Sequence, residues 1–259
     1  EIDAVLILTP HHNHSDLVIK ALNKGKAVYV EKPLALDMQS ITDIEESIYR
    51  TENPKLFIGF NRRFSKSAQF IKQKLINSPA NSINLRFSVP PLDSDHWTNI
   101  KEIGGGRIVG EAVHGIDLAC YLFDSLPQSI SASAPVDKTN NMVKDNQVFL
   151  NINFANGSHA SLQYFSEANQ ILSKERIEVH GEGNSYILED FKMLRFLEGS
   201  QDRSKTFSTG KGHKESLSIF FDYVRDKSQN PFTWEEIKAV SKAAIIAQDH
   251  INSGQQHNV

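Results

Sequence analysis

Short apolar runs separated by amphipathic stretches dominate the first 60 residues. The runs 4–8, 27–30 and 55–60 are almost continuously hydrophobic, which is typical of strands buried on both faces of a parallel sheet. Apolar side chains recur at helical spacing between these runs, and Asp37 occupies a favourable N-cap position for the second helix. The resulting strand–helix alternation predicts parallel strands joined by right-handed crossovers. Three strands make a small sheet, so we expect the back half of a doubly wound α/β domain in residues 1–64.

After residue 80 the hydrophobic period changes to two, which predicts strands with one buried face. The alternating segments are 84–89, 146–154, 158–164, 175–180, 185–189 and 192–197. Asn156-Gly157 separates two of them and is a strong hairpin signal. Two helical patterns follow at 213–227 and 234–252, and 125–146 is the least patterned stretch. Residues 65–259 are therefore predicted to form an α+β domain with a large open, mainly antiparallel meandering sheet.

Composition narrows the class of protein. The chain has 259 residues with 28 basic and 31 acidic side chains, so its charge gives no reason to expect a nucleic-acid partner. The single cysteine, Cys120, excludes an internal disulfide and fits a reducing compartment. No apolar run approaches the roughly 18 residues of a membrane span. We expect no membrane partner and a cytoplasmic location.

The first candidate for chemistry is Lys32, which follows the second apolar run in Glu31-Lys32-Pro33. Ligands of open α/β sheets bind beyond the carboxyl ends of the strands. A lysine fixed at that edge is positioned to transfer protons. An ordinary surface lysine at the end of a strand is the alternative.

The second candidate is the segment 104–117, which begins with three consecutive glycines and continues as a helix. One helical face is apolar and is expected to enter the core; its members are Val109, Ala112, Val113, Ile116, Cys120 and Phe123. Glu111, His114 and Asp117 share the other side at i, i+3 and i+6, where a histidine with acidic neighbours suits a proton relay or hydroxyl binding. A solvated helix face is the alternative, although Leu118 on that side favours a cleft wall.

Two further groups of residues, three histidines near the start of the chain and the segment 93–97, each allow two interpretations. His11, His12 and His14 lie close in sequence, but no acidic or cysteine ligand completes a metal site, and we expect none. The polar and aromatic segment 93–97 ends in Trp97, which suits either stacking on a sugar or packing on the sheet.

In this order and spacing, four motifs resemble the glucose–fructose oxidoreductase/inositol dehydrogenase/MocA (Gfo/Idh/MocA) family of NAD(P)-dependent oxidoreductases. The motifs are Thr9-Pro10 with His14, Glu31-Lys32-Pro33, Gly59-Phe-Asn-Arg-Arg-Phe64, and the glycine loop with His114 and Asp117. The resemblance covers essentially the whole chain. It implies a Rossmann domain, here only its C-terminal half, followed by an open-sheet domain that binds substrate and forms oligomers. Substrate and nicotinamide would meet between them.

The resemblance also implies roles for individual residues. Lys32 and His114 would be catalytic, exchanging the proton while hydride passes between nicotinamide C4 and a hydroxyl-bearing carbon. The implied cofactor-binding residues are Thr9, Pro10, His14, Glu31, Lys32 and Pro33. The implied substrate-binding residues are Lys32, Arg63, Trp97, Glu111, His114 and Asp117. The expected partners are NAD or NADP and a sugar or polyol, with a homodimer or homotetramer formed through the open sheet.

Two departures from the family pattern matter. Many members carry an aspartate where this chain has Gly110, and Glu111 would point about 100° away from that position on an α-helical wheel. The glycine-rich phosphate loop and the acidic ribose-binding residue do not occur in this sequence, and Gly181-Glu-Gly183 joins antiparallel strands instead of opening a helix. We therefore expect the chain to bind the dinucleotide weakly. The alternatives are a hydrolase or lyase that uses NAD transiently and a non-catalytic sugar-binding or assembly module.

Overall fold

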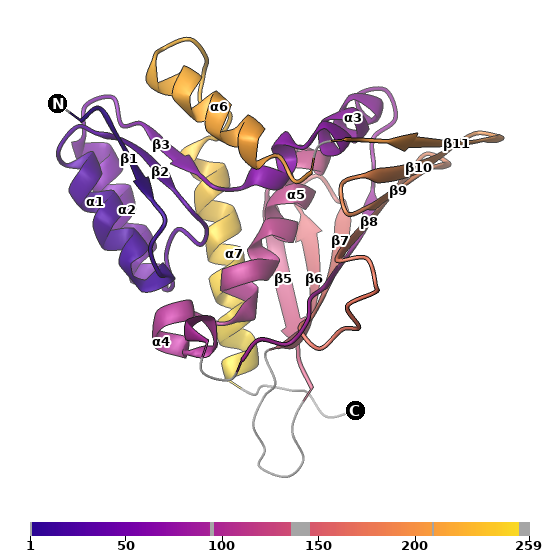
Figure 1. Cartoon of the computed structure of the whole chain (residues 1–259), viewed down its shortest axis with the longest axis horizontal. Helices are drawn as coiled ribbons and strands as arrows, with labels where there is room; N and C mark the ends of the chain where they lie inside the picture. Colours follow the sequence, from indigo (N-terminus) through magenta and orange to yellow (C-terminus); the bar gives the residue numbers. More distant parts are fainter. Residues whose placement is uncertain (1, 94–95, 136–145, 209, 254–259) are drawn as a thin grey trace.

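Two sheets organise the chain in the computed structural model, which describes residues 2–93, 96–135, 146–208 and 210–253 (Figure 1). The smaller sheet has three parallel strands in the order β1-β2-β3. Its strands and helices are β1 (Ala4–Ile7), α1 (His14–Leu22), β2 (Ala27–Val30), α2 (Met38–Arg50) and β3 (Leu56–Ile58). The predicted α/β half-domain is confirmed, and the Asp37 side chain caps α2 by accepting from the Ser40 amide at 2.8 Å. The predicted domain boundary at residue 64 stays a prediction.

The larger sheet has eight strands in the order β11-β10-β9-β8-β4-β7-β6-β5. The strands are β4 (Ser82–Ser88), β5 (Pro127–Ser133), β6 (Gln147–Phe154), β7 (His159–Phe165), β8 (Glu175–Gly181), β9 (Asn184–Glu189), β10 (Met193–Glu198) and β11 (Gln201–Thr206). Neighbours run antiparallel except β4 and β7, which are parallel. The mainly antiparallel sheet is confirmed, but a simple meander is wrong because β4 lies between β7 and β8.

The hydrophobic pattern missed two strands at the ends of this sheet. β5 falls in the stretch expected to be irregular, and its mostly small, polar residues give a weak alternation. β11 has no apolar residue, and all six of its residues are exposed. It pairs with β10 alone, so it forms a polar edge of the kind that discourages pairing with other chains.

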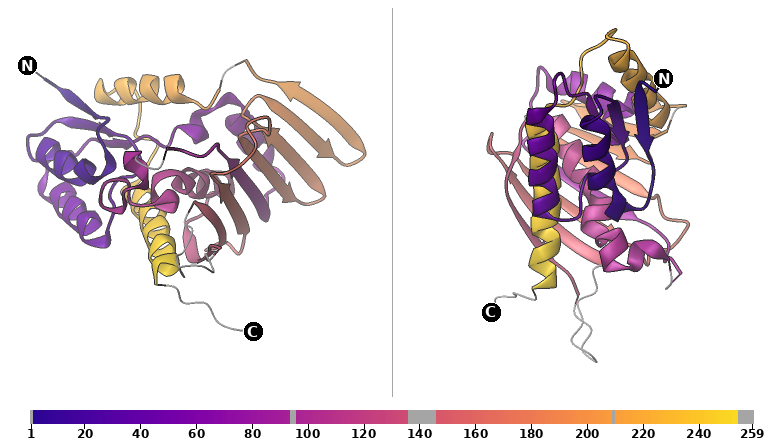
Figure 2. Two further views of the ribbon diagram at one scale, coloured as in Figure 1. Left: turned by 60° about the horizontal axis from the view of Figure 1, so that its bottom comes forward. Right: turned by 90° about the vertical axis from the view of Figure 1, so that its left-hand side faces the viewer.

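Helices fill the space between the two sheets. Figure 1 shows α5 and α7 between the small sheet on the left and the large sheet on the right. The remaining helices are α3 (Lys66–Leu75), α4 (Lys101–Gly104), α5 (Val113–Phe123), α6 (His213–Val224) and α7 (Trp234–Asn252). Figure 2 shows the helices gathered on one side of the large sheet, and β6 accordingly alternates buried and exposed residues. Within the described ranges, no helix is both long and apolar enough to span a bilayer.

Helix α5 is enclosed on all sides. Ten of its eleven residues are buried, with only Tyr121 partly exposed, so the predicted apolar face is confirmed and a solvated opposite face is excluded. A helix buried around its whole circumference must pair its polar side chains inside the protein. His114 and Asp117 on α5 are therefore held in protein surroundings.

Candidate active site

Lys32 links the two parts of the chain. The fully buried strand β2 delivers it to the carboxyl edge of the small sheet, directly after Glu31. Its ammonium donates to the carbonyl oxygen of Gly110 at 2.5 Å and to Glu111 Oε1 at 2.8 Å. Its side chain is only 13% exposed, so the lysine is not an ordinary surface side chain. This contact brings three of the predicted site residues, Lys32, Glu111 and the nearby His114, into one region.

A π-helix explains why Glu111 reaches Lys32. Residues Ile108–Ala112 form a π-helical turn before α5 begins at Val113. Such a turn has more residues per turn than an α-helix, which changes the direction of every side chain in it. Glu111 therefore reaches Lys32 although it is expected about 100° from position 110, and its replacement of the family's aspartate stays a prediction. Burial would raise the pKa of Glu111, but the charge and hydrogen bond of Lys32 outweigh it and hold this pKa below its usual value.

His11 holds the glycine loop against the small sheet. Its Nδ1 donates to the carbonyl oxygen of Gly104 at 2.8 Å, and its ring makes a T-shaped contact with Trp97, with the ring centroids 4.7 Å apart. A Cβ atom on Gly110 would lie 3.2 Å from His11 Cε1, which is a tight contact. A larger side chain at position 110, such as the family's aspartate, would require His11 to move.

His11 also gives the fold a pH dependence. Burial lowers the pKa of His11 from 6.5 to about 4. Between these values the unfolded chain binds a proton that the folded chain excludes, so stability present above pH 6.5 is lost as the pH falls towards 4. His11→Asn should flatten the slope of unfolding free energy against pH in this window by up to about 1.4 kcal/mol per pH unit.

Urea unfolding at a series of pH values measures that slope. His12→Gln is the matched control, because His12 is an exposed histidine beside His11. An unchanged slope in the His11→Asn protein would contradict the assignment.

The predicted cofactor residues gather around His14, which is fully buried. Its ring nitrogens lie 2.7 Å from the carbonyl oxygen of Pro33 and 2.9 Å from that of Thr9. The histidine therefore fastens the Thr9-Pro10 loop to the loop after β2, where the Lys32–Pro33 peptide bond is cis. With both nitrogens against carbonyl oxygens, His14 has none left for a metal ion.

Glu31 is the first residue of the loop after β2, directly before Lys32. Its carboxylate accepts from the Lys32 amide at 3.3 Å and from the Tyr29 hydroxyl at 3.4 Å. A Cβ atom on Gly59 would lie 2.8 Å from this carboxylate, so a larger residue there would require the Glu31 side chain to shift. Glu31 is thus packed at the ends of two neighbouring parallel strands, β2 and β3.

His114 lies on α5, is 4% exposed and contacts the Phe60 ring with ring centroids 6.4 Å apart. Its Nδ1 atom is enclosed and has no hydrogen-bond partner among the residues that the structure describes. Burial lowers the pKa of His114 well below its usual value, and the charges of Arg62 and Lys32 lower it further. The imidazole is therefore neutral at neutral pH.

A buried charge cluster that the sequence did not reveal lies beside this histidine. Arg62 donates two hydrogen bonds, at 2.8 and 2.9 Å, to Glu175 at the start of β8, and Lys211 binds the same carboxylate. The charge of Lys211 also contributes to the lowered pKa of His114. Asn61 donates to the Lys211 carbonyl at 2.7 Å, and a Cβ atom on Gly212 would lie 2.4 Å from the Asn61 carbonyl oxygen. The glycines on both sides of Lys211 were the available signal, but nothing in its sequence context connects it to Arg62 or His114, which lie much earlier in the chain.

Two predicted substrate residues pair with each other. Arg63 and Asp117 form an ion pair at 2.5 Å in which their side chains are 3% and 1% exposed. Burial raises the pKa of Asp117 to about 6, although Arg63 opposes this shift. Glu236 approaches the same guanidinium at 3.3 Å. The structure therefore gives both residues partners within the protein, and their substrate roles stay predictions.

Trp97 is partly exposed and lies between His11 and His96, whose ring centroids are 4.7 and 5.8 Å away. Its ring contacts are with these two histidines, and its packing on the large sheet stays a prediction. Its stacking on a sugar stays a prediction. Residues 94–95 of the same segment lie outside the described residues.

Comparison with known proteins identifies relatives over nearly the whole chain. Residues 1–60 match the model of the oxidoreductase family with an NAD-binding Rossmann fold, and residues 79–187 match the GFO/IDH/MocA C-terminal domain. Inositol 2-dehydrogenase of Rhizobium meliloti is 28% identical over 237 residues, covering 80% of this chain and 69% of that protein. Myo-inositol 2-dehydrogenase of Thermotoga maritima is 25% identical, covering 98% of this chain and 73% of that protein.

Solved structures show the same fold. Levoglucosan dehydrogenase, solved with NADH and levoglucosan, superimposes with a TM-score of 0.82 at 20% identity, covering 98% of this chain and 79% of that one. The two family matches together span more than half of the 259 residues, in the order that the two sheets follow along the chain. The chain belongs to the Gfo/Idh/MocA family of NAD(P)-dependent oxidoreductases, and the two relatives described above are inositol dehydrogenases.

Proposed function

We propose that this protein oxidises a hydroxyl group of a sugar or polyol with NAD or NADP, and that Lys32 and His114 handle the proton. The observation that carries the proposal is the contact of Lys32 with Gly110 and Glu111, one helical turn before the buried, neutral His114. Proton donors and acceptors at the carboxyl edge of a parallel sheet suit chemistry on a bound small molecule.

The residues of the chain fit a nicotinamide at this edge. Thr9, Pro10 and Pro33 are drawn together by His14, next to Lys32, and an enclosed polar atom of His114 has no partner among the described residues. The bound nicotinamide supplies the hydride acceptor. Lys32 orients the substrate oxygen and stabilises the negative charge that develops on it. His114, being neutral, accepts the proton that the hydroxyl loses.

Glu111 has a positioning role in this proposal. Its carboxylate and the Gly110 carbonyl hold the Lys32 ammonium from two directions, at 2.8 and 2.5 Å. The flexible lysine side chain is thereby fixed at the edge of the sheet. The π-helical turn thus provides an acid near the lysine in a chain that lacks the family's aspartate at position 110.

Three parts of the sequence-based expectation stay predictions: weak dinucleotide binding by this chain, oligomer formation through the uncovered face of the large sheet, and a cytoplasmic location. Titration of the protein with NADH and with NADPH, followed by fluorescence, measures cofactor affinity and decides between the two dinucleotides.

The substrate class is tested with a panel of neutral polyols and sugars that includes myo-inositol, scyllo-inositol and levoglucosan. We expect oxidation of at least one member with stoichiometric formation of NADH or NADPH at high cofactor concentration. Product formation without net reduced cofactor would instead indicate the hydrolase or lyase alternative. Dinucleotide binding with no conversion of any polyol or sugar would favour the non-catalytic module.

A further inference from the structure

A buried arginine that pairs with no carboxylate of the described residues faces a polar pocket beside the glycine loop. Arg107 is 7% exposed, and its guanidinium makes one hydrogen bond to a described residue, to Asn99 Oδ1 at 2.6 Å. It forms no ion pair with any carboxylate in the described part of the chain. Burying a charge without an opposite charge is costly, so such an arginine points to a missing anionic partner.

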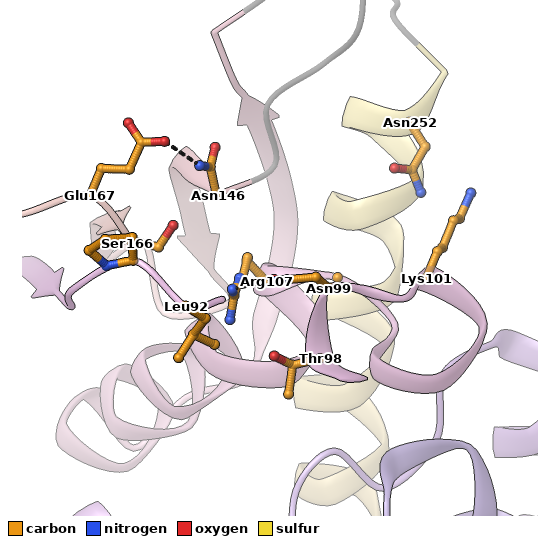
Figure 3. Close-up of a pocket in the computed structure, with 11 residues that line it drawn as sticks. Leu92, Thr98, Asn99, Lys101, Arg107, Asn146, Ser166, Glu167 and Asn252 are labelled. Atoms are coloured by element: carbon orange, nitrogen blue, oxygen red, sulfur yellow. Dashed lines mark hydrogen bonds between the residues drawn. The ribbon is translucent and has the colours of Figure 1, made fainter. Parts of the chain in front are cut away.

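The pocket has a volume of about 500 Å³, enough for a small metabolite. Figure 3 shows the Arg107 guanidinium in the midst of its lining, with Lys101 and Asn252 to the right. Lys101 adds a second positive charge, and Thr98, Asn99 and Ser166 add hydroxyl and amide groups.

The acidic residue of the lining, Glu167, is directed at neighbours other than the arginine and forms no ion pair with it. Both carboxylate oxygens of Glu167 accept hydrogen bonds, from Asn146 at 2.8 Å and from Gln147 at 2.9 Å. The Asn146–Glu167 bond is drawn in Figure 3. The side-chain oxygen of Asn146, Oδ1, is enclosed and has no hydrogen-bond partner among the described residues. An anionic group of a ligand would pair with the Arg107 guanidinium. A hydroxyl group of the same ligand would donate to the Asn146 side-chain oxygen.

The arginine is held in place by its backbone. Gln248 on α7 accepts from the Ile108 amide at 3.1 Å, and a Cβ atom on Gly106 would lie 2.4 Å from that Gln248 oxygen. Gly106 has φ +94°, a conformation that favours glycine. Arg107 is thus fixed before any ligand binds, which lowers the entropic cost of binding.

We propose that this pocket binds a small polar anion, a hydroxylated carboxylate or phosphate ester, with Arg107 as its counter-ion. The planar guanidinium presents paired N–H donors that match the geometry of both groups. The site is separate from the proposed chemistry at Lys32, but it adjoins the π-helix that carries Glu111.

Thermal unfolding of the whole chain tests the proposal without requiring turnover. D-glucuronate, D-glucose 6-phosphate and inorganic phosphate are compared with D-glucose at equal ionic strength. At least one anion should raise the melting temperature of the wild type by about 3 °C or more, and D-glucose should not. Comparing D-glucuronate with D-glucose 6-phosphate shows whether a carboxylate or a phosphate is preferred. Comparing D-glucose 6-phosphate with inorganic phosphate shows whether the hydroxyl groups contribute.

Variants assign the effect to the arginine. Arg107→Gln should abolish the anion-dependent shift and, without ligand, melt no lower than wild type, because it removes a buried charge that no described carboxylate pairs with. Arg107→Lys should keep part of the shift, and Arg50→Gln, which changes an exposed arginine, should keep all of it. Equal shifts in wild type and Arg107→Gln would overturn the proposal. So would an absence of any shift in wild type, whether or not Arg107→Gln melts lower.

Discussion

Replacing Lys32 with alanine is expected to lower kcat by about 10²–10⁴-fold, the range contributed by a positioned proton-transfer group. The lysine is the point at which β2 of the small sheet meets the segment before α5. Its loss removes the group that stabilises the substrate oxygen and leaves the Glu111 carboxylate without its ion pair. The measurement is steady-state formation of reduced cofactor on whichever polyol or sugar the wild type converts.

Two controls separate catalysis from folding. Lys24→Ala changes an exposed lysine before β2 and should leave kcat unchanged. Glu111→Gln keeps a side chain of the same size but removes the charge that fixes Lys32, so we expect a smaller loss, of about 10²-fold. Full activity in a folded Lys32→Ala protein, judged by its circular dichroism and melting temperature, would disprove the catalytic role.

Replacing Asp117 with alanine should reduce the free energy of unfolding by about 3–5 kcal/mol. The reason is that the Arg63 guanidinium, 3% exposed, would lose the carboxylate that it contacts at 2.5 Å. Glu236 at 3.3 Å belongs to a more exposed side chain and would replace only part of that interaction. Chemical denaturation measures the change.

The double variant Arg63→Met/Asp117→Leu distinguishes a structural pair from a substrate site. Removing both charges together should recover most of the stability lost in Asp117→Ala, because neither partner is left buried and unpaired. If Asp117→Ala instead kept its stability and raised KM alone, the residue would bind substrate as the family resemblance implies.

Most of the fold could be predicted from hydrophobic periodicity. The runs in the first 60 residues and the alternating segments after residue 80 correspond to strands that are buried on two faces or on one. Strand β11 could not be found in this way, because an exposed edge strand places no side chain in the core and therefore needs no apolar residue. The position of β4 between β7 and β8 also leaves no trace in a pattern that reports burial and not neighbours.

The sequence predicted which residues belong to the candidate site, but not which side chains contact each other within it. Lys32 and His114 stand out from motifs, whereas the contact of Lys32 with Glu111 depends on a π-helical turn that an α-helical wheel misplaces. The same limit applies to Asp117, which shares a helical side with His114 yet pairs with Arg63. Pairings across more than fifty residues depend on tertiary packing, and a single sequence does not encode them locally.

The central position of β4 has a consequence for how the protein is made. Both neighbours of β4 come later in the chain: β4 begins at Ser82, β7 at His159 and β8 at Glu175. During synthesis from the N-terminus, both edges of β4 therefore stay unpaired until most of the chain has emerged from the ribosome. Contacts between residues so distant in sequence are slow to form, so we infer that the large sheet assembles late, around a strand that is vulnerable to aggregation until then.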